Sequence, residues 1–254
     1  PGKEDVTPYL RVAAMLQEIG VHAPRILQRS ERDGFLLLTD LGTTMYLPEL
    51  TRPGQADRLY ADALAALVQM QARGVLAAAE LPPYDEKLLR FEMSLFPDWL
   101  LQRHLSLELS AREAQVLQQS MTALVANALE QPQVFVHRDY HSRNLMVCPE
   151  ANPGIIDFQD AVRGGLTYDL VSLLRDSYIA WPQARVVGWA LEFRRLAIAA
   201  GLPAGRDEAQ FLRWFDLMGV QRHLKVGGIF ARLCHRDGKP GYLADIPRTL
   251  QYAV

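Results

Sequence analysis

The sequence is poor in cysteine, and Cys148 and Cys234 are its two thiols among 254 residues. Two cysteines supply neither a cysteine-rich metal cluster nor a disulfide framework. Both stand among apolar neighbours, which favours reduced packing thiols in a cytosolic protein. We therefore expect no disulfide and no cysteine-bound metal.

Long apolar runs and an excess of positive charge are missing as well. No apolar stretch reaches the roughly 20 residues of a membrane-spanning helix, and no basic start leads into an apolar run as in a secretory signal. The 27 Lys and Arg residues face 29 Asp and Glu residues, so the net charge of −2 gives no general polyanion-binding signature. We expect a cytoplasmic monomer with neither membrane nor nucleic acid as a partner.

An initiator methionine is absent too, because the chain opens with PGKEDVTPYL, and we expect residues to be missing in front of Pro1. The hydrophobic fraction of 49% over 254 residues is enough to bury a sizeable core. That size fits one large domain or two small ones.

Apolar spacing predicts a helical protein with a few strands between the helices. Residues 55–74 carry their apolar side chains on one stripe, which is typical of an amphipathic helix. Further helices are expected over 4–20, 86–105 (broken or kinked at Pro97), 110–130, 168–181, 183–200 and 207–235. Strands are expected over 24–27, 34–42, 134–137, 145–148 and 154–157. This order indicates an α+β fold, mostly helical in its second part, with a small β insert.

The stretch HRDYHSRN, residues 137–144, has the spacing of a phosphoryl-transfer site. Asp139 is followed five residues later by Asn144, and Asp157 stands thirteen residues further on, at the end of the next predicted strand. Phosphoryl transfer needs a carboxylate that orients and deprotonates the attacking hydroxyl, together with oxygen ligands for Mg²⁺. A loop between two strands can bring Asp139 to the hydroxyl and Asn144 and Asp157 to the metal. A single Asp in a loop is more often a turn or cap residue. Here, however, the residue types at four positions agree with the spacing of the phosphoryl-transfer motif.

A second His-Arg-Asp, residues 235–237, fails this test. Tyr242 stands where the Asn would be needed, and no Asp-Phe pair follows within reach. The stretch ends a long helical pattern and enters a Gly/Pro turn, where His235 and Arg236 suit the exposed carbonyls of a helix C-terminus. We interpret this copy as a helix end.

The segment after Asp157 decides between branches of kinase-like enzymes. QDAVRGGLT leads straight into a helix at Tyr168, with no APE motif and no room for a peptide-docking activation segment. HRDYHSRNLMV, GIIDFQDA and YDLVSLLRD together resemble the aminoglycoside phosphotransferase family of small-molecule kinases. With FLLLTDLG, they are similar more closely to the bacterial N-acetylmuramate/N-acetylglucosamine anomeric kinases of cell-wall recycling.

The resemblance implies a role for each residue of the motif. Asp139 would be the catalytic base, and Asn144 and Asp157 would hold Mg²⁺ against the phosphates of ATP. His137 and Asp169 would give structural support to the catalytic loop. An acid at position 169 also suits a helix N-terminus, and the two roles are compatible.

The resemblance also implies a protein-kinase-like fold with a division after the hinge. Residues 1–42 would be the remnant of an N-terminal nucleotide-binding lobe, and residues 43–254 the catalytic and substrate lobe. Asp40, Leu41 and Gly42 would form the hinge whose backbone binds the adenine edge. The glycine-rich loop and the phosphate-binding Lys of such kinases are absent from the sequence, so we expect an incomplete N-terminal lobe, with both features upstream of Pro1.

The acceptor is suggested by charge. Residues 182–254 hold eleven Lys and Arg against six Asp and Glu, although such residues are often only a solvated face. A basic site favours a neutral or anionic sugar over a polycationic aminoglycoside. The candidate residues for contact with the acceptor are Arg163, Arg222, Lys225, Tyr178 and Trp181. The two aromatic residues could stack on a sugar ring, but they fit a place in the hydrophobic core equally well.

The sequence thus predicts an ATP- and Mg²⁺-dependent kinase acting on the anomeric hydroxyl of an N-acetylated amino sugar. Two alternatives stay open. One is phosphorylation of an aminoglycoside or another hydroxylated small molecule, and the other is a catalytically inactive binding module, favoured by the absent Lys and glycine-rich loop.

Overall fold

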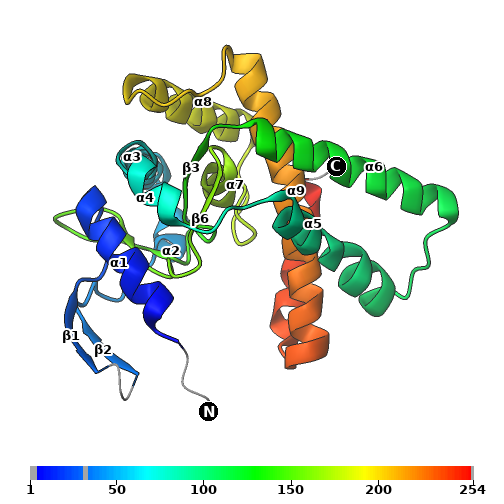
Figure 1. The fold of residues 1–254 in the computed structure, drawn as a ribbon, viewed down its shortest axis with the longest axis horizontal. Helices are drawn as coiled ribbons and strands as arrows, with labels where there is room; N and C mark the ends of the chain where they lie inside the picture. The colour runs from blue at the N-terminus through cyan, green and yellow to red at the C-terminus, as the bar shows by residue number, and fades with distance from the viewer. Residues whose placement is uncertain (1–4, 31–33, 253–254) are drawn as a thin grey trace.

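The computed structural model describes residues 5–30 and 34–252 (Figure 1). Its helices are α1 (Thr7–Ile19), α2 (Tyr46–Leu50), α3 (Ala56–Arg73), α4 (Val75–Glu80), α5 (Glu86–Leu95), the π-helix η1 (Phe96–His104), α6 (Ala111–Glu130), α7 (Tyr168–Leu174), α8 (Gln183–Ala199), α9 (Glu208–Asp237), the 3₁₀-helix η2 (Pro240–Asp245) and α10 (Ile246–Gln251). Its strands are β1 (Ile26–Ser30), β2 (Phe35–Leu38), β3 (Gln133–Val136), β4 (Leu145–Met146), β5 (Gly154–Ile155) and β6 (Val162–Gly165). The predicted α+β, mostly helical fold is confirmed.

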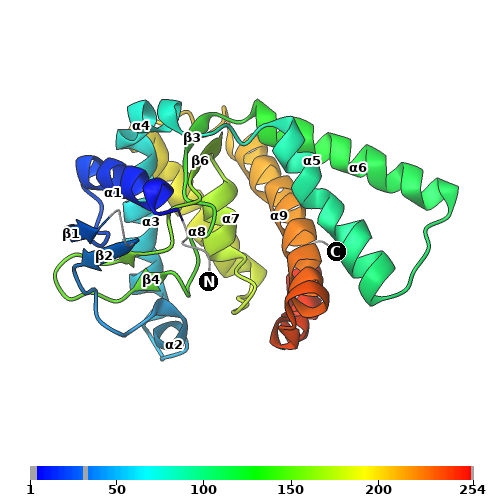
Figure 2. The ribbon, with the colours of Figure 1, turned by 60° about the horizontal axis from the view of Figure 1, so that its bottom comes forward.

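The strands pair into three antiparallel two-stranded sheets within the described ranges: β1 with β2, β3 with β6, and β4 with β5. The first sheet and α1 lie together at one end of the molecule, and α5, η1 and α6 lie at the other (Figures 1 and 2). The other two sheets flank the predicted catalytic loop, since β3 ends just before it and β4 begins just after it. The expected β insert therefore frames the motif of residues 137–144.

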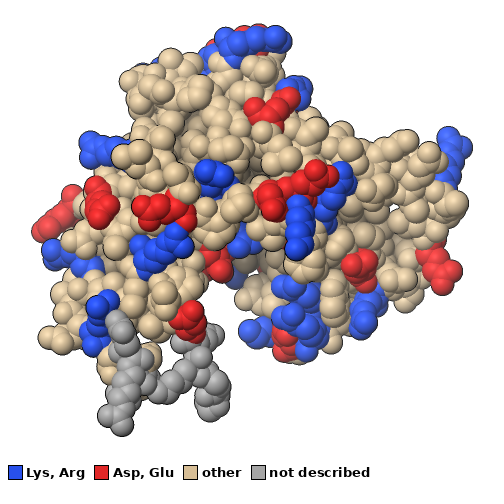
Figure 3. Space-filling model, in the orientation of Figure 1, with Lys and Arg blue, Asp and Glu red and all other residues tan. Residues whose placement is uncertain are grey.

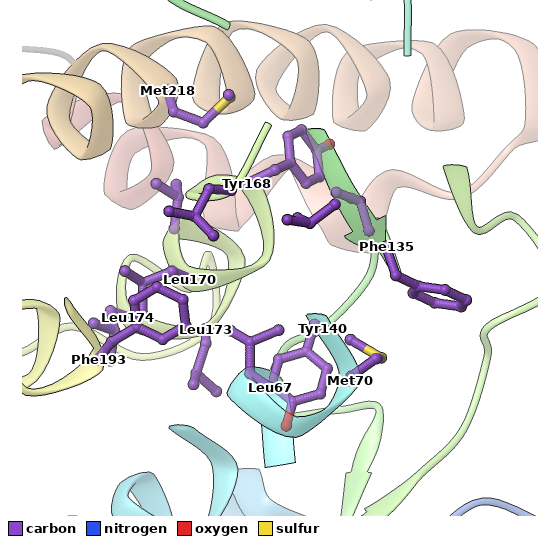
Figure 4. Packing of buried hydrophobic residues seen from close by; sticks show 14 of the residues in the cluster. Leu67, Met70, Phe135, Tyr140, Tyr168, Leu170, Leu173, Leu174, Phe193 and Met218 are labelled. Carbon is purple, nitrogen blue, oxygen red and sulfur yellow. The ribbon is translucent and has the colours of Figure 1, made fainter. Parts of the chain in front are cut away.

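The core forms around α7, whose seven residues are all buried. Figure 4 shows its leucines between side chains of α3, α8 and α9, with Phe135 and Tyr140 from β3 and the catalytic loop. The hydroxyl of Tyr140 donates a hydrogen bond to the carbonyl of Ala63 at 2.8 Å. This packing fixes the start of the catalytic loop against the helical body. No helix within residues 5–30 and 34–252 has the length and apolar character needed to cross a membrane.

Two predicted helices are corrected by the structure. The helix predicted over 168–181 ends at Leu174, because the Asp176 carboxylate accepts the backbone N–H groups of Ser142 and Tyr178 and holds the chain in a non-helical path. The helix predicted over 86–105 divides into α5 and the π-helix η1, with Pro97 in the first turn of η1. Residue 4 of the first predicted helix lies outside the described residues.

Five short elements were not expected from the sequence: α2, α4, β6, η2 and α10. α2 overlaps the segment 48–54 that its Pro and Gly residues mark as loop, and β6 has the sequence VRGG, without an apolar alternation. Tertiary contacts hold both of these, and in α2 the backbone N–H of Leu47 donates to the carbonyl of Ser142. In β6, Arg163 pairs with Phe135 of β3 on one side and exchanges backbone hydrogen bonds with Pro82 and Tyr84 on the other.

Candidate active site

The catalytic loop is anchored by the carboxylate of Asp169 at the start of α7. Asp169 accepts the backbone N–H of His137 at 2.7 Å and that of Arg138 at 3.0 Å. Burial raises the pKa of Asp169 to about 7, although these two hydrogen bonds act in the opposite direction. Arg138 has a φ of 76°, a left-handed conformation that a residue with a side chain rarely adopts. Asp169 thus fixes the backbone immediately before Asp139.

His137 fastens the same loop to the strand that leads to Asp157. Its Nε2 lies 3.1 Å from the carbonyl of Ile156, and its Nδ1 lies 3.3 Å from the backbone N–H of Asp139. The ring therefore donates from Nε2 and accepts at Nδ1, which requires a neutral imidazole. Burial lowers the pKa of His137 to about 4, in agreement with that state.

Asp139, Asn144 and Asp157 converge on one point. The amide Nδ2 of Asn144 donates to the carbonyl of Asp139 at 3.0 Å and to Oδ2 of Asp157 at 3.1 Å. Gln159 donates to the other carboxylate oxygen of Asp157 at 2.9 Å, and Asp157 has a φ of 64°. Both N–H groups of the Asn144 amide are thereby engaged, which leaves its oxygen available to a cation beside the Asp157 carboxylate. Amide and carboxylate oxygens are the donors that Mg²⁺ prefers, so these residues fit such an ion.

The convergence point opens into a cavity of about 390 Å³. The catalytic loop and Asp157 form one wall, and α9 contributes the cations Arg222 and Lys225. Tyr178 and Tyr242 also line it, from the chain after α7 and from η2, together with apolar side chains of α9. The structure therefore brings Arg222, Lys225 and Tyr178 into one site with Asp139.

The cations set the charge state of Asp139. Burial alone would raise the pKa of this carboxyl group, but Lys225, His141 and Arg222 together lower it below the ordinary value. Asp139 is therefore ionised at neutral pH and able to accept a hydrogen bond from a hydroxyl. Other basic residues of the C-terminal region form a surface: Figure 3 shows Lys and Arg gathered over the C-terminal half of α9.

Arg163 and Trp181 lie elsewhere. Arg163 lines a separate depression between α4 and the segment 83–85, because β6 lies between β3 and that segment. The indole of Trp181 donates to the hydroxyl of Tyr60 at 2.8 Å and packs edge-on against Trp189. Neither residue lines the cavity of Asp139.

The predicted hinge is also apart from this cavity. Asp40 accepts the backbone N–H of Gly42 at 2.8 Å, and Gly42 has a φ of 84°, which turns the chain after β2. Asp40 and Leu41 line a cavity of about 830 Å³ between α1, α3 and residues 151–153, which shares no lining residue with the cavity of Asp139. The structure does not bring the predicted hinge and the cavity of Asp139 together.

Sequence reasoning missed Glu92 of α5, which is buried behind the cavity. Its carboxylate lies 3.0 Å from the Lys225 ammonium, forms an ion pair with Arg138, and accepts the hydroxyl of Tyr84. Besides its contact with Glu92, the Lys225 ammonium donates a hydrogen bond to the hydroxyl of Tyr168 at 2.9 Å. Burial opposes ionisation of Glu92, but Lys225 and Arg138 outweigh it and lower its pKa. A lone Glu on an amphipathic helix gives no signal for such a role, because its partners are distant in the sequence.

Comparison with known proteins identifies the family of the chain. The model of the phosphotransferase enzyme family matches residues 1–215. The chain is 51% identical over 252 residues to the N-acetylmuramate/N-acetylglucosamine kinase of Pseudomonas aeruginosa, covering 99% of this chain and 73% of that protein. It is 42% identical over 255 residues to the kinase of the same name from Neisseria meningitidis serogroup B, covering 99% and 75%.

Solved structures agree on the fold. A choline/ethanolamine kinase family protein from Mesorhizobium loti superposes with a TM-score of 0.66 at 16% identity, covering 99% of this chain and 79% of that one. The GDP complex of aminoglycoside 2'-phosphotransferase-IIIa gives a TM-score of 0.63 at 16% identity, covering 98% and 83%. With a family model that covers most of its length and relatives of this identity, the chain belongs to the phosphotransferase enzyme family.

Proposed function

We propose that this phosphotransferase uses ATP to phosphorylate the anomeric hydroxyl of N-acetylmuramate, N-acetylglucosamine or both, in the recycling of peptidoglycan. The observation that carries the proposal is the shared cavity in which an ionised Asp139 faces two cations and adjoins the pair Asn144 and Asp157. The relatives at 51% and 42% identity, which bear the name of this activity, support the choice of acceptor.

In this proposal Asp139 orients the acceptor. Its carboxylate accepts a hydrogen bond from the anomeric hydroxyl and aligns the oxygen with the γ-phosphorus. It takes the proton as the new oxygen–phosphorus bond forms and the bond from the γ-phosphorus to the departing ADP oxygen breaks. Asp169 holds the backbone of His137 and Arg138, and His137 accepts the backbone N–H of Asp139, so the backbone that carries the carboxylate is positioned before substrate arrives.

Asn144 and Asp157 would hold Mg²⁺ through their oxygens, and the ion would neutralise charge on the nucleotide phosphates. Asp40, Leu41 and Gly42 would bind the adenine edge as a hinge between residues 1–42 and residues 43–254. These assignments, together with a monomeric state and a cytoplasmic location, remain predictions.

An aminoglycoside is a weaker candidate for this cavity. Small-molecule sites range over roughly 300–1,000 Å³, so about 390 Å³ suits a single sugar ring better than several. Arg222, for which no carboxylate partner is found among the described residues, would repel a polycation at close range. An inactive binding module is disfavoured because Asp139, Asn144 and Asp157 are all present and convergent.

The test is a panel of acceptors offered with ATP to the full-length enzyme, with ADP release as the readout. We expect turnover of N-acetylmuramate or N-acetylglucosamine and none of kanamycin. Turnover of kanamycin without turnover of either sugar would contradict the proposed acceptor. No ADP release with any acceptor, under conditions in which nucleotide binds, would favour the binding module.

A further inference from the structure

The acceptor cavity contains a group of buried polar atoms that the protein itself does not satisfy. Among the described residues, Nε and Nη1 of Arg222, Oγ of Ser177 and Nδ1 of His141 are buried without a hydrogen-bond partner. Arg222 is only 4% exposed and Ser177 only 3%. All three side chains line the cavity of Asp139, although they come from α9, the segment after α7 and the catalytic loop.

Lys225 lies one turn further along α9 than Arg222 and, unlike Arg222, has its hydrogen-bond partners within the protein. Its ammonium group already has the carboxylate of Glu92 at 3.0 Å and the hydroxyl of Tyr168 at 2.9 Å. The protein therefore neutralises one of the two cavity cations with a buried carboxylate and leaves the other without one.

A buried guanidinium without a carboxylate is unfavourable, because the lost hydration is not replaced. Native proteins leave few such groups, and several of them in one cavity indicate that a ligand supplies the missing acceptors. An unpaired guanidinium N–H donates a charge-assisted hydrogen bond to a carboxylate oxygen, and the hydroxyl of Ser177, which lines the same cavity, can donate another. Asp139, whose pKa Arg222 helps to lower, is reserved for the acceptor hydroxyl in the proposed reaction.

We propose that Arg222, with Ser177 and His141, forms a receptor for a carboxylate on the acceptor sugar and so makes this enzyme prefer a sugar acid over the neutral sugar. This inference rests on the proposed function. In N-acetylmuramate the carboxylate belongs to the lactyl ether, which N-acetylglucosamine lacks. The other source of an oxyanion is the transferred phosphoryl group. We favour the sugar because Arg222 and Ser177 approach from α9 and the segment after α7, whereas the phosphates are assigned to Asn144 and Asp157.

The test compares three acceptors in the full-length enzyme: N-acetylmuramate, its neutral carboxamide and N-acetylglucosamine. We expect the wild-type kcat/KM to favour the acid over the carboxamide by roughly 10- to 100-fold, the contribution of a hydrogen bond to a charged group. Arg222→Met should remove that preference by raising KM for the acid, so that the ratio of kcat/KM for the acid to that for the carboxamide falls to about one, beside any loss common to all three acceptors that follows from the weaker positive charge near Asp139. Arg213→Met is the matched control, since Arg213 stands on the same helix, pairs with Glu130 at the surface, and does not line the cavity.

Two results would overturn the receptor. Equal kcat/KM for the acid and its carboxamide in the wild-type enzyme would do so without any variant, so that a folding defect could not confuse the outcome. An equal loss for all three acceptors in Arg222→Met, with Arg213→Met normal, would assign the arginine to the phosphoryl group. Failure of the wild-type enzyme to phosphorylate any of the three would instead refute the proposed function.

Discussion

Replacing Glu92 with Gln should destabilise the protein strongly, because Glu92 is the anion shared by two buried cations. The side chains of Glu92 and Lys225 are 5% and 8% exposed, and that of Arg138 is 20% exposed. Removing one partner of a buried ion pair costs about 3–5 kcal/mol. The partial exposure of Arg138 places the expected loss near the lower end, about 3 kcal/mol, which for a chain of this size lowers Tm by about 6–12 °C.

Glu86→Gln provides the control on the same helix. Glu86 is 58% exposed and pairs with Arg90 one turn away, so its loss should cost less than about 1 kcal/mol. Both variants can be compared with the wild-type protein by urea unfolding at pH 7. Equal free energies of unfolding for the two variants would refute the account of Glu92 as a buried anchor.

The same pair of proteins gives a pH dependence. The pKa of Glu92 is lower in the folded protein than its ordinary value of 4.5, since Lys225 and Arg138 outweigh the effect of burial. Its ionisation therefore stabilises the fold above pH 4.5, and this contribution is lost as the pH falls through the folded pKa. The difference in unfolding free energy between wild type and Glu92→Gln should shrink in that range. A difference that is constant from pH 7 to pH 3 would contradict the assigned charges.

Three further predictions concern the loop, the helix packing and the metal. Burial lowers the pKa of His137 from 6.5 to about 4, so protonation of this side chain favours the unfolded state. The free energy of unfolding should therefore fall as the pH drops from about 6.5 towards 4. Urea titrations should show a weaker pH dependence for His137→Gln. Gly228→Ala should destabilise α9 by about 1–3 kcal/mol, since a Cβ would collide with the backbone of Leu95, whereas Gly188→Ala meets open space and should be neutral or stabilising in thermal unfolding. Asp157→Asn should abolish the dependence of nucleotide affinity on Mg²⁺ in calorimetric titrations, and an unchanged dependence would remove Asp157 from the metal site.

The elements that the sequence predicted well carry their signal locally. α6 has a capping box between Ser110 and Glu113, and α9 ends at Gly238 in the left-handed conformation, so both ends follow from nearby residues. The end of α7 could not be predicted, because Asp176 is drawn out of the helix by Ser142 from the catalytic loop. Such a contact exists only after the chain has folded.

The residues of the site likewise divide into those with a local sequence signal and those that depend on tertiary contacts. Asp139, Asn144 and Asp157 are read from one motif because a single loop and the next strand bring them together. Arg222 could be named only as one of several cations, and Arg163 lines a different depression, since charge alone does not say which cavity a side chain lines. Glu92 and the unpaired state of Arg222 depend on contacts between α5, α9 and the loop, which no local pattern encodes.

The most direct test of the central claim is to incubate the full-length enzyme and its Asp139→Asn variant with ATP, Mg²⁺ and N-acetylmuramate, and to follow the product by ³¹P NMR. The account predicts a phosphate on the anomeric oxygen with the wild-type enzyme. It predicts a loss of about 100- to 10,000-fold in kcat for the variant, with nucleotide binding and thermal stability retained. A phosphate on another hydroxyl, or near-normal turnover by Asp139→Asn, would contradict it.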